Sequence, residues 1–210
     1  MANKAKKKIG LKGFAGVGIF PEVSDTETEY SAAGEKITFV GASSGSFTDN
    51  REDFEIPGDD GIYDSGSDWT STEVDVTIHE IDLSALAVLA GCDIDEVKKA
   101  IEEGTLDVPQ TVCLVYRALR RDGGYRCYRY YNCKLTNYSV NHNTKGSSND
   151  GQPYTLTFKC IPRAVDGKIR GTADVTNLAE ANTWLASIPT VIRSLLGVNL
   201  IWSTLVMAFT

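Results

Sequence analysis

The sequence predicts a mainly β protein: an antiparallel β-sandwich or barrel with one flanking helical segment, a long loop and terminal arms. Strand-like segments follow one another with few helices between them, which is typical of antiparallel sheets. Several of these segments alternate apolar and polar residues, as strands with one buried face do. The chain has 210 residues, of which 42% are hydrophobic and 23% charged, enough for one sizeable core.

Three parts are expected along the chain: an N-terminal arm at residues 1–20, a β-sandwich domain at residues 21–176, and an apolar C-terminal arm at residues 177–210. The start of the chain is basic because five lysines lie within residues 4–12. Residues 13–20 are apolar and dotted with glycine, which fits a short strand or a segment packed against a neighbour. A further strand is expected within residues 36–47.

One helical segment is expected at residues 84–103. It follows residues 74–78, whose alternating apolar residues predict a strand with one buried face. A first helix ends at Gly91. A second helix begins at Asp93, because Asp93 and Glu96 have the spacing of a capping box.

The second half of the chain is again rich in strands. Strand-like segments lie at residues 112–119, 125–135, 154–160 and after the turn at 166–170. The first two are joined by Arg-Asp-Gly-Gly, a strong hairpin signal. An amphipathic helix is expected at residues 177–188, before Pro189. Residues 194–210 carry no charge and are too short and too polar for a typical membrane span, so we expect them to be buried against a subunit.

The acidic segment, residues 48–69, is the most unusual stretch of the chain. It holds eight carboxylates against one cation, Arg51, and also several large apolar side chains. Pro57 and three glycines predict that no strand runs far through it. A loop of this length is usually functional or disordered, and its aromatic residues favour ordering on a partner.

Arginines and tyrosines alternate along the hairpin at residues 116–130. Such a surface could bind nucleic acid, or its arginines could simply be solvated. The net charge of −7 speaks against nucleic acid. We favour a contact between the arginine hairpin of one copy and the acidic segment of the next, which would fix their register. The residues predicted for this contact are Asp53, Glu55, Asp59, Asp60, Asp64 and Trp69 on the acidic side, and Arg117, Arg120, Arg121, Arg126 and Arg129 on the basic side.

No catalytic, cofactor or metal site is expected, so the chain is not predicted to be an enzyme. The residues around Ser43 match the G-x-S-x-G hydrolase motif, but no helix is expected directly after that serine, as the motif requires. His79 and His142 are more consistent with surface positions. The acidic segment lacks the full spacing of a calcium loop. The five cysteines include no close pair, which predicts reduced thiols and folding in the cytoplasm.

The layout resembles the major tail protein, or tail tube protein, of long-tailed bacteriophages and prophages. The resemblance rests on the lysine-rich arm, an early strand, a long polar loop, and a strand leading into the helix motif L-S-x-L-A-x-L-x-G. Residues 130–135, 154–158 and 166–169 are also similar to that family's strands. It covers roughly residues 4–172 through layout and short motifs, none of which is diagnostic alone, and the apolar C-terminus does not fit the family pattern.

This resemblance implies a structural virion protein located in the tail and assembled in the host cytoplasm. Six copies would form a ring, and rings would stack into a tube through which DNA passes without sequence-specific binding. The implied partners are further copies, the tape-measure protein and tail-end proteins, with no membrane involved. An acidic lumen would let DNA slide without sticking.

Two other functions stay open from the sequence. The chain could be the tube protein of a contractile tail or of a secretion-type injection system, which shares this architecture. It could instead be a membrane-anchored β-sandwich binding domain held by its apolar C-terminus.

Overall fold

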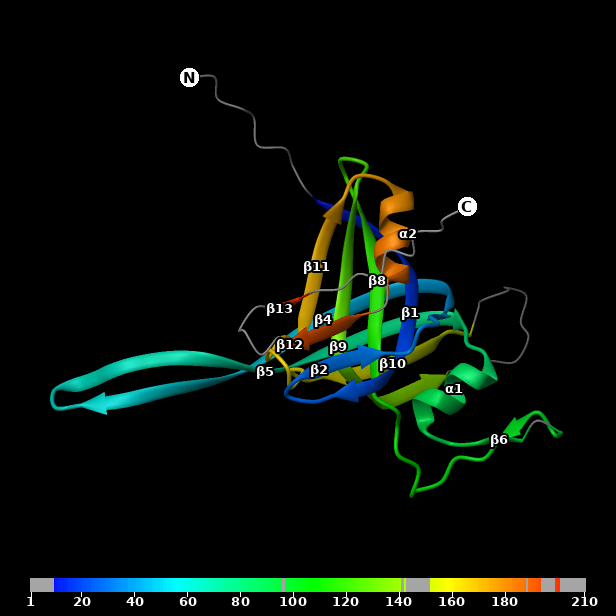
Figure 1. Cartoon of the computed structure of the whole chain (residues 1–210), viewed down its shortest axis with the longest axis horizontal. Helices are drawn as coiled ribbons and strands as arrows, with labels where there is room; N and C mark the ends of the chain where they lie inside the picture. Colours follow the sequence, from blue (N-terminus) through cyan, green and yellow to red (C-terminus); the bar gives the residue numbers. More distant parts are fainter. Residues whose placement is uncertain are drawn as a thin grey trace.

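The computed structural model describes residues 10–95, 97–140, 142, 152–187, 189–193 and 199–200. The strands in this part of the chain are β1 (Leu11–Asp25), β2 (Glu29–Ala32), β3 (Ile37–Thr38), β4 (Val40–Gly58), β5 (Gly61–Glu80), β6 (Ile94–Asp95), β7 (Ala100–Ile101), β8 (Val112–Arg120), β9 (Tyr125–Val140), β10 (Tyr154–Cys160), β11 (Arg170–Val175), β12 (Thr190–Arg193) and β13 (Asn199–Leu200). The helices are α1 (Leu83–Ala90) and α2 (Leu178–Ala186) (Figure 1). The predictions for residues 1–9 and for most of residues 194–210 concern segments outside the described residues.

One large antiparallel sheet contains most of these strands. Its order is β13-β12-β2-β1-β8-β9-β10-β5-β4, with β11 beside β9 and β3 beside β1. The predicted mainly β, antiparallel fold is confirmed. The described strands do not close into a barrel, because β4 and β13 end the order without pairing with each other.

The long strand β9 carries the chain from one part of the sheet to another. Its first residues pair with β8 and β11, whereas its last residues pair with β10. Between these two parts Asn132 has a positive φ of 48°, a conformation that asparagine tolerates better than most residues. The Asn132 side chain donates a 2.7 Å hydrogen bond to Asp25 at the end of β1. This bend lets one strand take part in two regions of the core.

Two clusters of buried side chains form the core. The larger one contains alternating residues of β5 and β10, together with Ala85 and Leu89 of α1. In β5 the buried apolar residues are Val74, Val76 and Ile78, the residues predicted from the period of two. The smaller cluster lies under α2, where Ala181 and Leu185 are fully buried.

Helix α2 confirms the helix predicted at residues 177–188. Its N-cap is Asn177, whose side chain accepts a 2.8 Å hydrogen bond from the backbone N–H of Glu180. The Glu180 carboxylate in turn accepts hydrogen bonds from the backbone N–H and the hydroxyl of Thr176. The contact between Asn177 and Glu180 satisfies one of the donors that a helix N-terminus leaves free.

The predicted boundaries of the first arm and of the helical segment were partly wrong. Strand β1 begins at Leu11 and pairs with β8, so residues 11–20 belong to the sheet. Of the two predicted helices only the first forms, and β6 at residues 94–95 pairs antiparallel with β7 at residues 100–101 instead. There the Asp95 side chain accepts hydrogen bonds from two nearby backbone N–H groups, and Val97 is 93% exposed. A helix at this position would be stabilised by burying Val97 on its apolar face, and Val97 is exposed instead.

The expectation of five reduced cysteines was also wrong. Cys133 in β9 and Cys160 in β10 are register partners and form a disulfide. The spacing of the cysteines in the sequence did not reveal that these two strands are neighbours. Cys92, Cys113 and Cys127 are free thiols. No helix among the described residues has the length and apolar character that crossing a membrane requires.

Candidate interaction surface

The acidic segment is not a loop but the outer part of the long hairpin formed by β4 and β5. Paired residues run without interruption from Val40 and Glu80 to the turn at Gly58 and Gly61, apart from three register shifts. The predicted break at proline and glycine was therefore wrong. Pro57 and the two turn glycines lie at the end of the hairpin, where they can be accommodated.

Residues 51–68 form what we call the projecting hairpin. They extend from the body of the protein as a two-stranded ribbon (Figure 1). At roughly 3.3 Å per residue, its eight residues from Arg51 to Gly58 span about 25 Å. Nearly all its side chains are exposed, including Tyr63 at 82%. The ribbon therefore lacks a core of its own, and such isolated hairpins are marginally stable in water.

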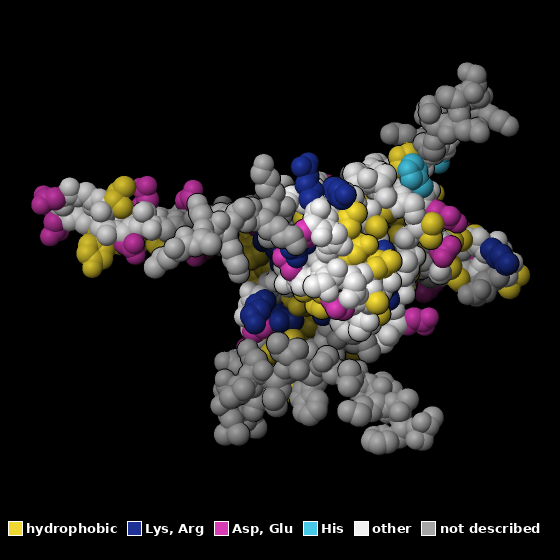
Figure 2. All heavy atoms as spheres, turned by 90° about the horizontal axis from the view of Figure 1, so that it is seen from above, with side chains coloured by type: hydrophobic (Ala, Val, Ile, Leu, Met, Phe, Trp, Pro, Cys, Tyr) yellow, Lys and Arg dark blue, Asp and Glu magenta, His cyan; other side chains and the backbone are white. Residues whose placement is uncertain are grey.

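Carboxylates and apolar side chains share the projecting hairpin (Figure 2). Seven carboxylates and one cation, Arg51, give it a formal charge of −6. Among the described residues, no ion pair involves any of these carboxylates, which are Glu52, Asp53, Glu55, Asp59, Asp60, Asp64 and Asp68. Glu52 even lies directly opposite Asp68, a like-charge arrangement that destabilises a strand pair.

Arg170 holds the root of the projecting hairpin. Its guanidinium lies 4.8 Å from the ring centroid of Phe47 in β4 and 5.1 Å from that of Trp69 in β5. It also lies 3.3 Å from the carboxylate of Asp49 in an ion pair. Arg170 belongs to β11, so one side chain ties the hairpin to a distant part of the sheet.

A hydrogen-bonded chain completes this root. The Asp49 carboxylate accepts a 2.8 Å hydrogen bond from the hydroxyl of Thr72, which is fully buried. The Thr72 hydroxyl oxygen accepts a 3.0 Å hydrogen bond from the indole N–H of Trp69. The Arg51 guanidinium also lies over the Trp69 ring, 5.7 Å from its centroid. Sequence reasoning missed Arg170, because no local pattern links it to residues about a hundred positions away.

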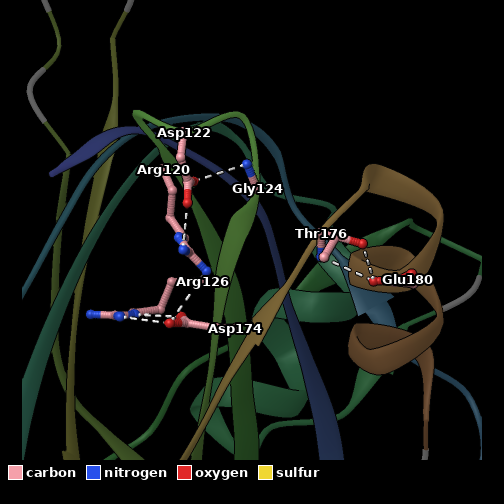
Figure 3. A network of polar contacts seen from close by, with 7 residues as sticks. All are labelled: Arg120, Asp122, Gly124, Arg126, Asp174, Thr176 and Glu180. Atoms are coloured by element: carbon pink, nitrogen blue, oxygen red, sulfur yellow. Dashed lines mark hydrogen bonds and ion pairs between the residues drawn. The ribbon is translucent and has the colours of Figure 1, made fainter. Parts of the chain in front are cut away.

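Several arginines of the predicted basic surface already have partners in their own chain. Arg126 donates two hydrogen bonds of 2.7 and 2.8 Å to Asp174, and this contact lowers the pKa of that carboxyl group (Figure 3). Arg120 pairs with Asp122 at 2.6 Å and with Asp174 at 3.3 Å. These contacts join the β8–β9 hairpin to β11.

The other predicted arginines differ in their surroundings. Arg129 is buried, donates hydrogen bonds to the backbone carbonyls of Trp184 and Ser187, and lies 4.3 Å from the Trp184 ring centroid. Arg117 donates a 2.9 Å hydrogen bond to the side chain of Asn182. Arg121 is exposed. Of the five arginines, Arg121 is thus the most accessible to a second copy, and the predicted contact between the two hairpins stays a prediction.

The residues considered for catalysis do not assemble into a site. The Ser43 hydroxyl donates a 3.3 Å hydrogen bond to the carbonyl of Thr77, and no hydrogen bond joins it to a histidine in the described part of the chain. His79 is exposed on β5, and His142 contacts Gln152 at 3.2 Å. No group of three or more metal-ligating side chains gathers within the described residues.

Comparisons with known proteins give matches among solved structures only. No family model matches the sequence, and no curated protein does. A chain of the anti-feeding prophage baseplate is 12% identical, with 82% of this chain and 97% of that chain covered and a TM-score of 0.38. A chain of the anti-feeding prophage cap, which terminates the tube, is 9% identical, with coverage of 82% and 99% and a TM-score of 0.42. A chain of the PVC sheath-tube complex, an extracellular contractile injection system in its extended state, is 13% identical, with coverage of 76% and 88% and a TM-score of 0.41.

Proposed function

We propose that this chain is a structural subunit of a phage tail-like tube and that it works by self-assembly. In this proposal six copies form a ring, rings stack into a hollow tube, and the tube conducts DNA. The proposal extends the similarity of the sequence layout to the tail tube family. Its partners would be further copies of the chain, with tape-measure and tail-end proteins at the tube's ends.

The projecting hairpin is the observation that carries this proposal. Residues 51–68 expose carboxylates and large apolar side chains on a ribbon that has no core of its own. Exposed apolar surface of this kind marks protein interaction sites. A subunit that must contact a neighbouring copy can use such a ribbon, whereas a catalytic domain has no evident need for one.

The open edge of the sheet supports the same proposal. Strand β4 ends the order of the described sheet, so its outer edge is available for pairing. Closure of a ring would remove such edges, and head-to-tail contacts that do not close would extend the tube along its axis. The net charge of −7 also suits a conduit that must not retain DNA.

Electron microscopy of the purified chain at high concentration tests the proposal. We expect rings or tubes with an axial repeat. A chain that stays monomeric at every concentration would refute it. A shortened variant tests the role of the projecting hairpin in assembly. It replaces residues 53–67 by Asn-Gly, a two-residue hairpin turn that joins the opposed residues Glu52 and Asp68.

This shortened variant should keep its thermal unfolding transition, because the deleted residues contribute little buried surface. It should form no tubes. Tubes of normal length from the shortened variant would show that the projecting hairpin is not used in assembly.

A further inference from the structure

One face of the projecting hairpin combines an apolar centre with an acidic border. Opposed residues of paired strands lie on the same face, and every second residue of a strand returns to it. Phe54 and Ile56 therefore share a face with Glu52, which comes before them on the strand. Asp64 and Asp68 lie on the same face of the partner strand, opposite Ile56 and Glu52.

Phe54 covers the middle of this face. Its ring passes so close to Gly66, the residue opposite, that any side chain at that position would collide with it. Phe54 is nevertheless 41% exposed and Ile56 is 45% exposed. The face thus offers a flat apolar surface about two residues long, bordered by three carboxylates.

The carboxylates on this face are open to an outside cation. No described cation forms an ion pair with any of them. The opposed pair Glu52 and Asp68 repel each other in the isolated chain. A bound cationic segment would relieve that repulsion and would cover Phe54 and Ile56.

The chain itself contains a segment with the matching chemistry. Residues 4–12 hold five lysines and no carboxylate, and the first acidic residue of the whole chain is Glu22. Ile9 and Leu11 lie among these lysines. Leu11 is 43% exposed at the start of β1, and the next residue, Lys12, is exposed too. The five positive charges compare with a formal charge of −6 on the projecting hairpin.

Other cations of the chain are less suited to this role. Six of them already form ion pairs among the described residues: Lys98, Arg120, Arg126, Arg163, Lys168 and Arg170. Arg129 is buried. None of these lies in a run of cations comparable to residues 4–12.

We infer that the projecting hairpin of one copy binds the lysine-rich segment, residues 4–12, of a second copy. This inference rests on the proposed function, because it names the contact by which copies recognise each other. Single exposed ion pairs are weak, but many copies in one assembly repeat the contact. The same charges favour association of copies in one orientation, hairpin to N-terminal segment.

Two full-chain variants with opposite charge changes test the inference. The first carries Glu52→Lys, Asp64→Lys and Asp68→Lys, which replaces the three carboxylates of the apolar face by cations and brings the formal charge of the projecting hairpin from −6 to zero. The second carries Lys6→Glu, Lys7→Glu and Lys8→Glu, which makes that segment acidic like the hairpin. Association is followed by sedimentation velocity, each variant alone and then the two mixed. A third variant with Glu27→Lys, Glu35→Lys and Glu80→Lys has the same change in net charge as the first, at exposed positions away from the hairpin.

Each variant alone should associate at least about tenfold more weakly than the wild type, since three lost contacts of about 0.5 kcal/mol equal roughly one factor of ten. The mixture should recover association, because the first variant still has a basic segment and the second an acidic hairpin. The control should associate like the wild type. Raising the salt from about 0.05 M to about 0.5 M should weaken the recovered complex, because salt screens exposed charges.

Three results would overturn the inference. Wild-type association by the first variant would show that the hairpin charges are not used, and would leave the proposed tube intact if tubes still form. A mixture that stays dissociated would show that the two segments do not meet between copies. Equal loss in the control would show an effect of net charge alone. The absence of tubes from the wild type, with recovery in the mixture, would instead refute the proposed function and keep the contact.

Discussion

Replacing Arg170 should loosen the root of the projecting hairpin and destabilise the whole fold. The guanidinium is about one-fifth exposed, pairs with Asp49 and lies over the rings of Phe47 and Trp69. A cation over an aromatic ring contributes about 0.5–2 kcal/mol, depending on its exposure. A hydrogen-bonded ion pair that is partly screened adds about 1 kcal/mol. Arg170→Ala should therefore cost about 2–3 kcal/mol of unfolding free energy.

Thermal and urea denaturation measure this loss. For a chain of this size, 1 kcal/mol shifts Tm by about 2–4 °C, so Arg170→Ala should lower Tm by roughly 4–12 °C. Arg170→Lys keeps the charge but not the planar fork, and should fall between the wild type and the alanine variant. Arg51→Ala is the matched control, because Arg51 also contacts Trp69 but is exposed. It should lower Tm by less than about 2 °C.

A stabilising role of Arg170 is excluded if Arg170→Ala unfolds within about 1 °C of the Arg51→Ala control. In that case the backbone pairing of β4 with β5 would stabilise the root of the hairpin, and the ring contacts and the ion pair with Asp49 would add little. Hydrogen exchange separates the two cases. Loss of the Arg170 contacts should speed exchange at residues 47–50 and 69–72 more than in β8.

Three further substitutions test separate features of the core. Burial, together with the nearby Asp25, raises the pKa of Glu22 from 4.5 to about 7, and one of its carboxylate oxygens is buried without a hydrogen-bond partner. The protonated form is thus favoured in the folded state, so the wild type should lose stability as pH rises from about 4.5 to about 7, by at most about 3 kcal/mol. Glu22→Gln should remove this pH dependence, and equal slopes for both proteins in urea titrations would contradict it. Asp166→Asn leaves the buried Arg163 without its carboxylate partner and should cost about 3 kcal/mol by urea denaturation, whereas a cost below about 1 kcal/mol would show that this ion pair is not stabilising. Gly91→Ala places a methyl group against the carbonyl of Val108 at a residue with a φ of 77°, so we expect a loss of about 2 kcal/mol or more, and an unchanged urea midpoint would contradict this.

The elements that the sequence predicted well are those whose local pattern agrees with their burial. Residues 74–78 and 154–160 alternate apolar and polar side chains, and their apolar members are fully buried in β5 and β10, apart from the half-buried Tyr154. The turn between β8 and β9 was identified from its glycines. Helix α2 was identified from its amphipathic pattern and from Pro189. In each case the local preference and the tertiary structure favour the same element.

The acidic segment was predicted as a loop because its residues are poor strand formers when taken singly. Proline and glycine weaken a strand in the middle of a sheet, where every N–H group must pair and every face must pack. A two-stranded ribbon in solvent is a different setting. Pro57 lies next to the turn, and Gly66 makes room for the ring of Phe54. Residue preferences measured in buried sheets therefore misjudge an exposed hairpin.

The contacts that position the candidate surface could not be read from the sequence. Arg170 and Asp49 are separated by more than a hundred residues, and neither belongs to a local motif. The same holds for Arg126 and Asp174, which form an ion pair. Because of this ion pair, Arg126 is less available for the predicted contact with a second copy. The carboxylates predicted for the acidic side of the contact lie exposed on the projecting hairpin, and their contact with a second copy stays a prediction. Charge composition could not show which arginines are already paired within the chain.

The projecting hairpin and the core have separate physical roles, and this separation has a measurable consequence. The hairpin beyond residue 50 buries little, so its carboxylates contribute almost nothing to unfolding free energy and are available to a partner. The Arg170 root contributes to stability and also fixes the direction in which the hairpin leaves the sheet. Charge reversals on residues 52–68 should thus change association without changing Tm, whereas Arg170→Ala should change both. If the charge reversals lowered Tm and left association unchanged, the projecting hairpin would have to contribute to the stability of the fold and not to the contact between copies.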